Sequence, residues 1–202
     1  MLTALLAWDE RIFRVLNDTW IHPALDRLLP LVTDARNYTI LFLLGAILIL
    51  FVGRMRGLRF LVLAVCSVIV ADAIGTHVFK LVFARTRPCI ALEGVRLLVG
   101  CVNSPSFPSN HAVNTSALAT LAALSRPRLW LPAAAMAMLV GYSRVYTGAH
   151  YPLDVVAGGV LGMAVALTLS AVMSRLWASD PGPGERRRTY ALKIEDNRRA
   201  SG

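Results

Sequence analysis

Five apolar segments separated by short polar connections restrict this chain to folds that a lipid bilayer allows. The segments cover residues 38–53, 58–83, 109–125, 129–147 and 152–177. In hydrocarbon, every backbone N–H and C=O group must be paired within the protein, which a single apolar segment achieves only as a helix. The pattern therefore predicts an all-α fold, an integral-membrane bundle of about five transmembrane helices.

The composition also favours a bilayer over water as the solvent. The chain is 56% hydrophobic and 16% charged, whereas soluble domains have nearer a quarter of charged residues. The net charge of +9 would suit a nucleic-acid-binding protein, but the basic residues lack interleaved aromatic side chains, so we expect no nucleic acid partner. The basic residues instead gather between apolar segments and in the tail: Arg54, Arg56, Arg59, Arg126, Arg128 and Arg186 to Arg199.

These basic clusters predict an orientation, because cytoplasmic connections carry an excess of lysine and arginine. The loops at 54–57 and 126–128 and the tail at 179–202 are expected in the cytoplasm. The long loop at 84–107 and the short turn at 148–151 are then expected outside. The chain is thus predicted to be a multi-pass protein of a bacterial-type cytoplasmic (inner) membrane, with its chemistry on the external, periplasmic face.

Residues 1–36 lack an apolar run of spanning length and have the pattern of an amphipathic helix. Apolar residues recur at helical spacing with charged residues opposite them: Leu2, Leu5, Leu6, Ile12, Phe13 and Leu16 against Asp9, Glu10, Arg11 and Arg14. We expect this helix and a shorter piece at 23–32 to rest on the bilayer or on the bundle. The predicted organisation is an interfacial segment at 1–36, a transmembrane bundle at 37–178 and a basic, disordered tail at 179–202.

Three polar stretches at the predicted outer face contain the residues that indicate chemistry. In the first, Lys80 ends an apolar segment and Arg87 follows two helical turns later. Lysine supplies a mobile point charge, and arginine supplies a planar fork that matches phosphate oxygens. Basic residues at helix ends also reach for lipid headgroups, so this stretch alone is compatible with simple anchoring.

The second stretch, residues 107–112, places Ser109 where a helix begins. The unpaired N–H groups and positive dipole of a helix N-terminus bind anions. His111 in the first turn can donate a proton to a leaving oxygen. An ordinary capped helix that contains a histidine has the same pattern.

The third stretch runs from Ser143 to Asp154 and contains Arg144 and His150. If the next helix begins near Pro152, Asp154 lies one turn beyond His150 and can accept its Nδ1 proton. A carboxylate in that position orients the imidazole and stabilises the imidazolium, which leaves Nε2 free as a nucleophile. Asp154 could instead serve only as a capping acid.

Together the three stretches resemble the signature of the type-2 phosphatidic acid phosphatase superfamily: lysine, six residues and Arg-Pro; Pro-Ser-x-His; and Ser-Arg, five residues, His, three residues and Asp. The resemblance covers roughly residues 58–177 and is specific in order and spacing. It implies an integral-membrane lipid phosphatase and a metal-independent reaction through a phosphohistidine. It implies that His150 is the nucleophile, that Asp154 orients it and that His111 is the acid. It also implies a set of phosphate-binding groups: Lys80, Arg87, Ser109, Arg144 and the backbone N–H of Asn110.

Asn110 departs from the family's pattern, which usually has glycine at this position. Asparagine is the next best tolerated residue where φ is positive, and its amide could also contact the phosphate. In the second apolar segment, Asp72 and His77 are expected to form hydrogen bonds inside the bundle, with a direct role as the less favoured alternative. No carboxylate-rich loop or paired-cysteine cluster predicts a metal site, so we expect no cofactor.

Three cysteines are too few for a disulfide framework. Cys66 lies in an apolar segment and is expected to be a buried packing residue. Cys89 and Cys101 both lie in the long external loop, where an oxidising compartment would allow them to pair. Two free thiols fit the sequence equally well.

The sequence thus predicts a lipid phosphatase that acts at the outer leaflet. Undecaprenyl diphosphate is slightly favoured as the substrate, because a small bundle without added domains suits a thin lipid. Phosphatidylglycerol phosphate, phosphatidate and a lipid A phosphate are the alternatives. Two other functions fit the same residues: phosphotransfer to an acceptor alcohol, and non-catalytic binding or transport of lipid anions. The oligomeric state is not predicted.

Overall fold

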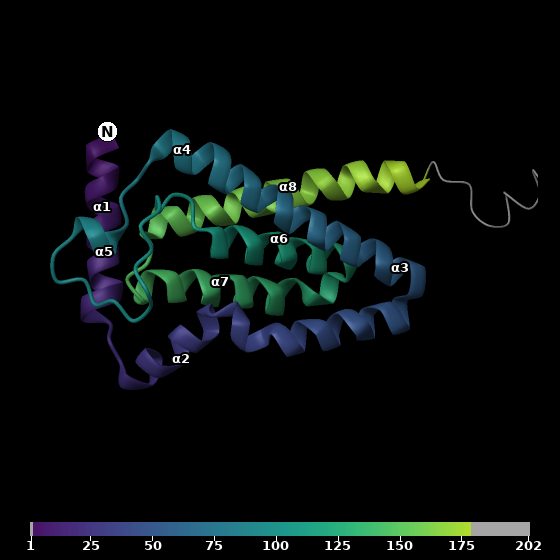
Figure 1. The fold of residues 1–202 in the computed structure, drawn as a ribbon, viewed down its shortest axis with the longest axis horizontal. Coiled ribbons are helices and arrows are strands. Elements are labelled where there is room, and N and C mark those ends of the chain that lie inside the picture. Colours follow the sequence, from purple (N-terminus) through teal and green to yellow (C-terminus); the bar gives the residue numbers. More distant parts are fainter. Residues whose placement is uncertain (1, 179–202) are drawn as a thin grey trace, which may run out of the picture. The chain divides into compact units, whose positions relative to one another are not determined.

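The computed structural model describes residues 2–178, and every regular element in that range is helical, which confirms the all-α prediction there. The chain separates into two compact units after Leu169. The second unit begins with the last turns of α8, and the predicted disordered tail at 179–202 lies outside the described residues. The elements are α1 (Leu2–Arg14), η1 (Val15–Thr19), α2 (Pro23–Thr33), η2 (Ala35–Tyr38), α3 (Thr39–Ile74), η3 (Gly75–Phe79), α4 (Lys80–Phe83), α5 (Pro88–Ala91), α6 (Asn110–Ser125), η4 (Pro127–Leu129), α7 (Trp130–Tyr146) and α8 (Pro152–Ala178) (Figure 1).

α3 reverses its direction near its middle and therefore consists of two helices, which meet at the turn and diverge from it (Figure 1). Arg54 has φ 47° and ψ −123°, outside the helical region. After the reversal, the backbone of Gly57 comes so close to the carbonyl group of Ile49 that a Cβ atom at position 57 would overlap it. The turn predicted from the basic cluster at 54–57 is present, and it joins the first two apolar segments.

α6 packs against α7, α3 and α8. One buried cluster joins three of these helices: Ala71, Val113 and Val165. The backbone of α8 approaches that of α6 because Gly158 and Gly162 have no side chain. A Cβ atom at Gly158 would lie 2.7 Å from the carbonyl oxygen of Ser109, and one at Gly162 would overlap the carbonyl group of Val113. This packing fixes the start of α8 against the start of α6, and with it the second polar stretch against the third.

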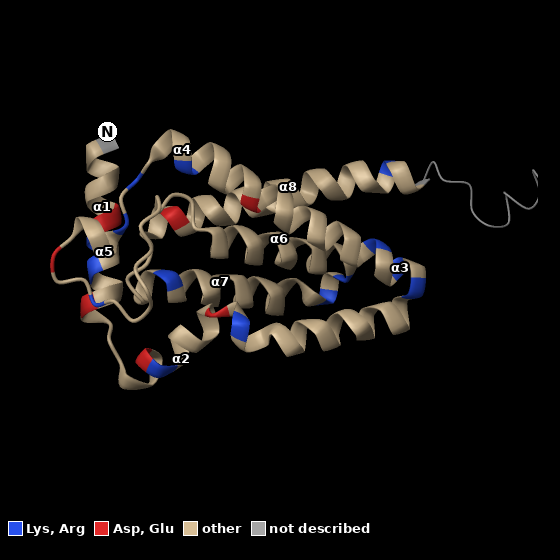
Figure 2. Ribbon diagram, viewed as in Figure 1, with Lys and Arg blue, Asp and Glu red and all other residues tan. Residues whose placement is uncertain are grey.

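Large apolar side chains are exposed along the flanks of the bundle, whereas Lys, Arg, Asp and Glu of the first unit lie mainly at its two ends (Figure 2). Phe51, for example, is 83% exposed. Two helical stretches are long and apolar enough to cross a membrane: residues 35–91, which include the reversal in α3, and Pro152–Trp177. α6 and α7, with 16 and 17 residues, coincide with the third and fourth predicted segments.

The N-terminal helices pack on the bundle at the end where α6 begins (Figure 1). α2 lies against α7, and the ring of Phe13 in α1 is buried 5.4 Å from that of Tyr151. Asp9 is also buried, with 3% exposure, while Trp8 and Ile12 are exposed. Asp9 is therefore buried although the amphipathic spacing sets it opposite the apolar side chains of this helix. Asp9 faces the bundle because an arginine there pairs with it.

η1 joins this N-terminal segment to α7 and to the long loop at 84–107. The buried Asn17 donates from Nδ2 to the carbonyl oxygens of Arg96 and Tyr146, at 2.9 and 2.8 Å, and its Oδ1 accepts from the Arg96 N–H group at 3.0 Å. Arg96 also pairs with Asp26 of α2 at 2.6 Å. The Tyr146 hydroxyl donates to the same carboxylate at 2.6 Å. Residues far apart in the sequence are thereby joined at one end of the bundle.

Gly162→Ala is expected to destabilise the bundle by about 1–3 kcal/mol, the usual cost of over-packing a core, because the added methyl group would overlap the carbonyl group of Val113. Gly45→Ala is the matched control, since nothing lies within 4 Å of a Cβ atom at that position. Thermal unfolding in detergent, followed by circular dichroism, measures both variants. Equal melting temperatures would contradict the close packing of α6 and α8.

Candidate active site

The turn between α7 and α8 places His150 inside the protein. Gly148, with φ +82°, ends α7, and a Cβ atom there would lie 2.9 Å from the carbonyl oxygen of Arg96. Only glycine adopts this left-handed conformation without strain. The carbonyl oxygen of Arg144 then accepts from the N–H groups of Ala149 at 3.1 Å and of His150 at 3.2 Å. The turn leaves His150 with 2% exposure.

The imidazole of His150 lies between an arginine and a carboxylate. Arg87 Nη1 is 3.0 Å from Nε2. Because a guanidinium can only donate, Nε2 accepts, and the proton of the neutral ring is on Nδ1. Nδ1 lies 3.5 Å from Asp154 Oδ2 and has no hydrogen-bond partner. The two side chains face each other, as their spacing predicts, at a separation longer than a strong hydrogen bond.

Burial keeps His150 neutral. It lowers the pKa of His150 from 6.5 to about 4; the charges of Arg87 and Arg144 act in the same direction, and Asp154 opposes them. At neutral pH the ring therefore has a lone pair on Nε2. This is the form of histidine that can attack an electrophile.

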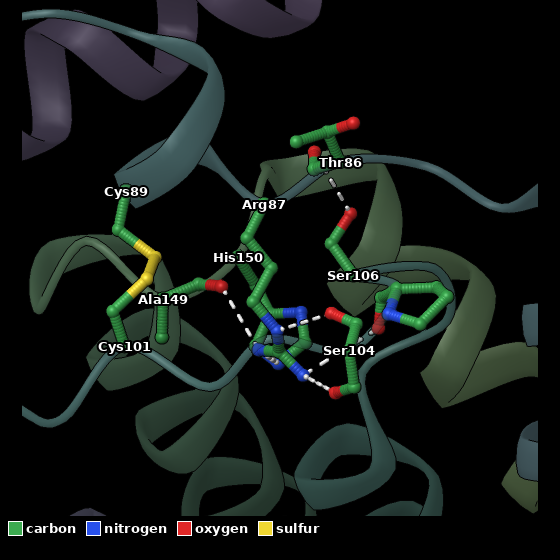
Figure 3. The surroundings of a disulfide bond; sticks show 9 residues. Thr86, Arg87, Cys89, Cys101, Ser104, Ser106, Ala149 and His150 are labelled. Atoms are coloured by element: carbon green, nitrogen blue, oxygen red, sulfur yellow. Dashed lines mark hydrogen bonds between the residues drawn. A yellow bond between two sulfur atoms is a disulfide. The ribbon is translucent and has the colours of Figure 1, made fainter.

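Arg87 is held by the long loop at 84–107 as well as by His150 (Figure 3). Its Nε donates to the carbonyl oxygen of Ser104 at 2.8 Å and its Nη2 to Ser104 Oγ at 3.1 Å. Its Nη1 also donates to the carbonyl oxygen of Ala149 at 3.2 Å. These hydrogen bonds from one buried guanidinium fix its plane against the His150 ring.

A disulfide joins Cys89 and Cys101, with Cα atoms 6.2 Å apart, so of the two alternatives for these cysteines the structure shows pairing (Figure 3). Cys89 follows Arg87 by two residues, and Cys101 precedes Ser104 by three. The disulfide therefore joins the two arms of the loop next to the contact between Arg87 and Ser104. Cys66 is free and half-buried.

Two more of the predicted residues lie near His150, and a third lies near Arg87. Arg144 is buried, and His111 is close enough to Arg144, Arg87 and His150 to interact with their charges. Lys80 is likewise within electrostatic range of Arg87. The structure thus gathers positive charge around Arg87 from α4, from α7 and from the loop at 84–107. Among residues 2–178, no group of three or more His, Cys, Asp or Glu side chains could hold a metal ion.

Ser109 precedes α6, and its hydroxyl is buried without a partner. Its N–H group donates to the carbonyl oxygen of Asp154 at 3.0 Å, whereas its Oγ makes no capping hydrogen bond. Arg144 Nε and His150 Nδ1 are also buried and unpaired. Unpaired polar groups are rare in protein interiors and call for an explanation. Ser109 Oγ and Arg144 Nε can both donate to an anion such as phosphate.

Asn110 begins α6 with its side chain directed into the bundle. Among the described residues other than glycine, only Arg54 and Ala84 have a positive φ. Asn110 does not, so the tolerance of asparagine for positive φ does not explain its presence at this position. Its Nδ2 donates to Asp72 Oδ1 at 2.6 Å and to Thr76 Oγ1 at 3.0 Å. Asp72 therefore forms hydrogen bonds in the bundle interior, as expected, and the Asn110 amide is engaged by it. The backbone N–H of Asn110 is the group left for an anion at this helix end.

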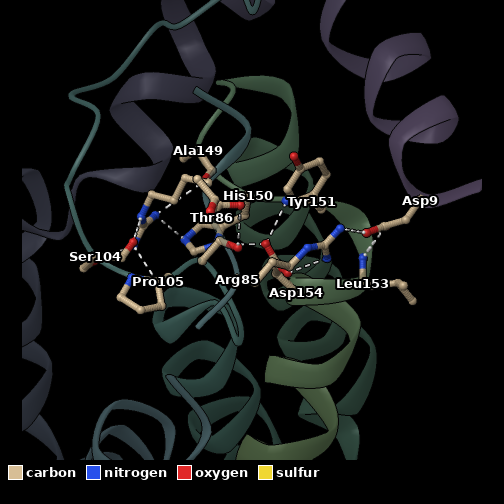
Figure 4. Close-up of polar contacts among 12 residues, drawn as sticks. Asp9, Arg85, Thr86, Ser104, Pro105, Ala149, His150, Tyr151, Leu153 and Asp154 are labelled. Carbon is tan, nitrogen blue, oxygen red and sulfur yellow. Dashed lines mark hydrogen bonds and ion pairs between the residues drawn. The ribbon is translucent and has the colours of Figure 1, made fainter. Parts of the chain in front are cut away.

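Three residues for which the motifs predict no role contact the site. Arg85 donates from Nη1 to Asp154 Oδ1 at 2.8 Å and from Nη2 to Asp9 Oδ2 at 2.6 Å (Figure 4). The hydroxyl of Thr33, at the end of α2, accepts from Arg144 Nη1 at 2.8 Å. Arg85 has a signal in the sequence, because it is the third basic residue of the first polar stretch. Asp9 and Thr33 lie in the N-terminal segment, where no local pattern marks them.

Comparison with known proteins places the chain beside membrane phosphatases. The family model described as the PAP2 superfamily matches residues 61–178. An undecaprenyl-diphosphatase from Sulfolobus acidocaldarius is 40% identical over 99 residues, 48% of this chain and 48% of that protein, so the match spans about half of the relative's length. The bacitracin transport permease protein BcrC of Bacillus licheniformis is 32% identical over 77% of this chain and 75% of that protein. The crystal structure of a transmembrane PAP2 type phosphatidylglycerolphosphate phosphatase from Bacillus subtilis has a TM-score of 0.65 and 25% identity, covering 85% of this chain and 87% of that one.

The environment of His150 leads to a pH prediction. Because burial favours its neutral form, the imidazole is expected to gain its second proton with a midpoint at about pH 4, well below the ordinary 6.5. Nitrogen-15 NMR of protein labelled at histidine measures the midpoint in detergent, and the signal that is lost in His150→Gln assigns it. A midpoint between pH 6 and 7 would contradict the buried, neutral ring.

Proposed function

Because the chain belongs to the PAP2 superfamily, we propose that it is an integral-membrane phosphatase that removes a terminal phosphate from a membrane lipid. One observation carries the proposal: buried His150 has its Nε2 lone pair against Arg87 Nη1 and its Nδ1 opposite Asp154. This is the arrangement of a histidine nucleophile with an orienting carboxylate. The cations beside it provide what a phosphate group requires.

In the proposed first step, the lone pair of His150 Nε2 attacks phosphorus. The P–O bond to the leaving group breaks with its electron pair on the leaving oxygen, and His111, which enters this step as the imidazolium, gives that oxygen a proton. Arg87 Nη1, which donates to Nε2 in the structure, transfers this hydrogen bond to a phosphate oxygen, the stronger acceptor because it is charged. Asp154 stabilises the imidazolium that forms. The products are a phosphohistidine and the dephosphorylated lipid.

In the second step, a water molecule attacks the phosphohistidine. His111, now neutral, takes a proton from the water, the N–P bond breaks and its electron pair returns to Nε2. Inorganic phosphate leaves, and both histidines are back in their starting states. An acceptor alcohol in place of water would give phosphotransfer through the same intermediate, which product analysis with an acceptor lipid distinguishes.

We assign the binding of the phosphoryl oxygens to the cations and to the start of α6. The proposed ligands are Lys80, Arg87, Arg144, the unpaired Ser109 hydroxyl and the backbone N–H of Asn110. Charged donors fixed in a buried site stabilise a phosphoryl transition state more than they would in water. They supply the positive charge that metal ions supply in other phosphoryl-transfer enzymes. We therefore propose a metal-independent hydrolase.

Undecaprenyl diphosphate is the proposed substrate. A relative that this chain matches over about half of the relative's length has the name undecaprenyl-diphosphatase. A small bundle also suits a thin prenyl lipid. With this substrate the first step cleaves the P–O–P linkage and releases the prenyl monophosphate. Phosphatidylglycerol phosphate, phosphatidate and a lipid A phosphate are alternatives, and a panel of these lipids ranks them directly.

We also propose a membrane arrangement. The two halves of α3 together with η3 and α4, then α6, α7 and α8, form five spans in the bundle at 37–178. Residues 1–36 lie at the outer interface, with Trp8 and Ile12 of α1 exposed towards lipid. The arginine-rich turns at 54–57 and 126–128 then lie in the cytoplasm, and the site lies on the periplasmic face of the inner membrane. A disulfide in the external loop fits an oxidising compartment.

His150→Ala is expected to reduce phosphate release from lipid diphosphate by more than about a thousandfold, because no other described group occupies the position of the nucleophile. His22→Asn is the control, since His22 caps α2 through its side chain and asparagine caps equally well. The assay uses purified protein in detergent, with and without EDTA. Turnover by His150→Ala would contradict the nucleophile, and loss of wild-type activity in EDTA would contradict the metal-independent reaction.

The proposed orientation predicts the access of thiol reagents. In intact cells, a membrane-impermeant maleimide is expected to label Cys89 and Cys101 only after their disulfide is reduced. A Cys89→Ser/Cys101→Ser variant is the control for labelling of Cys66. Labelling that requires broken cells, as well as reduction, would place the site on the cytoplasmic side.

A further inference from the structure

Arg85 lies between two buried carboxylates that are far apart in the sequence (Figure 4). Its Nη2 is 2.6 Å from Asp9 Oδ2 in α1, and its Nη1 is 2.8 Å from Asp154 Oδ1 in α8. The Arg85 side chain is 18% exposed, that of Asp9 1% and that of Asp154 0%. The guanidinium also lies 3.8 Å from the centre of the Tyr151 ring. Such a three-membered charge cluster in a buried position requires an explanation, because desolvating it is costly.

We propose that Asp9 and Arg85 are positioning residues for the Asp154–His150 pair, so that the N-terminal helix α1 belongs to the active-site machinery. The inference rests on the proposed function, in which His150 is the nucleophile. Asp9 and Arg85 act through Asp154, which Arg85 contacts directly.

The first part of their action is geometric. Asp154 Oδ1 is held by Arg85, while Oδ2 accepts from the Tyr151 N–H group at 2.9 Å and faces His150 Nδ1 at 3.5 Å. With a fixed partner on each oxygen, the carboxylate cannot rotate away from the imidazole. Asp9 Oδ1 accepts from the Leu153 N–H group at 2.8 Å. Asp9 therefore holds both the arginine and the first turn of the helix that carries Asp154.

The second part is electrostatic. Four groups on four elements act on or lie near the His150 ring: Arg87 from the external loop, Arg144 from α7, His111 from α6 and Asp154 from α8. Only Asp154 favours the imidazolium. The stability of the protonated or phosphorylated His150 ring therefore depends on how much negative charge Asp154 keeps.

One arginine paired with Asp154 alone would neutralise that charge. Because Asp9 shares the same guanidinium, the cluster keeps a net charge of −1, which offsets the imidazolium of the phosphohistidine. Removing Asp9 leaves a neutral cluster, and removing Arg85 leaves two carboxylates that repel each other. Removing both charges restores −1. The cluster therefore predicts single and double variants that do not combine additively.

The test compares Asp9→Asn, Arg85→Gln and the double variant in phosphate release from undecaprenyl diphosphate. Asp9→Asn is expected to lower kcat about tenfold, a smaller decrease than removal of the orienting aspartate itself would cause. Its KM is expected to stay within about twofold of the wild-type value. Arg85→Gln is expected to lose about a hundredfold in kcat, and the double variant to recover at least about tenfold over it. Asp18→Asn is the matched control, because Asp18 is a half-exposed acid of the same segment that pairs with Arg14; its kcat should stay within about twofold of wild type.

A second measurement does not depend on turnover. The NMR midpoint of His150 should fall in Asp9→Asn, which removes a negative charge, and rise in Arg85→Gln, which removes a positive one. In the double variant it should return towards wild type. A purely structural role would not move the two midpoints in opposite directions. If Arg85→Gln does not fold, Arg85→Lys keeps the charge without the bridging fork, and its midpoint should stay near wild type while kcat falls.

The outcomes separate this inference from the proposed function. If the wild-type protein turns over substrate and Asp9→Asn changes neither kcat nor the His150 midpoint, the inference is overturned. The proposed phosphatase activity is then unaffected. A KM that rises in step with the loss of kcat, or midpoints that shift in the same direction, also overturns it. Opposite midpoint shifts in a protein that releases phosphate from none of the lipids support the inference and contradict the proposed function.

Discussion

A charge buried away from water needs an opposite charge or strong hydrogen-bond partners at close range, and the polar end of this bundle is built on that requirement. Five side chains form a continuous series of contacts there. The Asp9 carboxylate lies 2.6 Å from the Arg85 guanidinium, which lies 2.8 Å from the Asp154 carboxylate. Asp154 in turn lies 3.5 Å from the His150 imidazole, and the imidazole lies 3.0 Å from the Arg87 guanidinium. The imidazole is the one member of this series without a full charge. It is therefore the member that can change its contacts without breaking an ion pair.

The helix packing serves to bring the members of this series together. Gly158 and Gly162 allow α8 to approach α6, which sets Asp154 beside the Ser109 N–H group. The Cys89–Cys101 disulfide closes the loop that holds Arg87. α1 contributes Asp9, and the end of α2 contributes Thr33. The N-terminal segment thus contacts the site at two points, although it lies outside residues 61–178, the part that the family model matches.

Much of this arrangement could be predicted from the sequence where the determining relation is local. The four-residue spacing of His150 and Asp154 predicts that they face each other, and the basic cluster at 54–57 predicts the reversal in α3. The contact of Asp9 with Arg85 spans 76 residues and that of Arg85 with Asp154 spans 69, and no periodicity encodes such pairs. Amphipathic spacing sets Asp9 on the polar face of α1, but spacing identifies a face and not the partner that the face meets. The pairing of the cysteines and the turn of Asn110 towards Asp72 likewise depend on tertiary contacts.

The most direct test of the account is to identify the residue that carries the phosphoryl group during turnover. Protein turning over lipid diphosphate labelled with ³²P in its terminal phosphate is quenched in alkali, which preserves phosphohistidine, and its peptides are mapped. The account predicts label on His150 in the wild-type protein and none in His150→Ala. Two results at saturating substrate would contradict it. The first is turnover with the label on another residue, and the second is turnover with no labelled protein at any time, which would mean direct transfer to water.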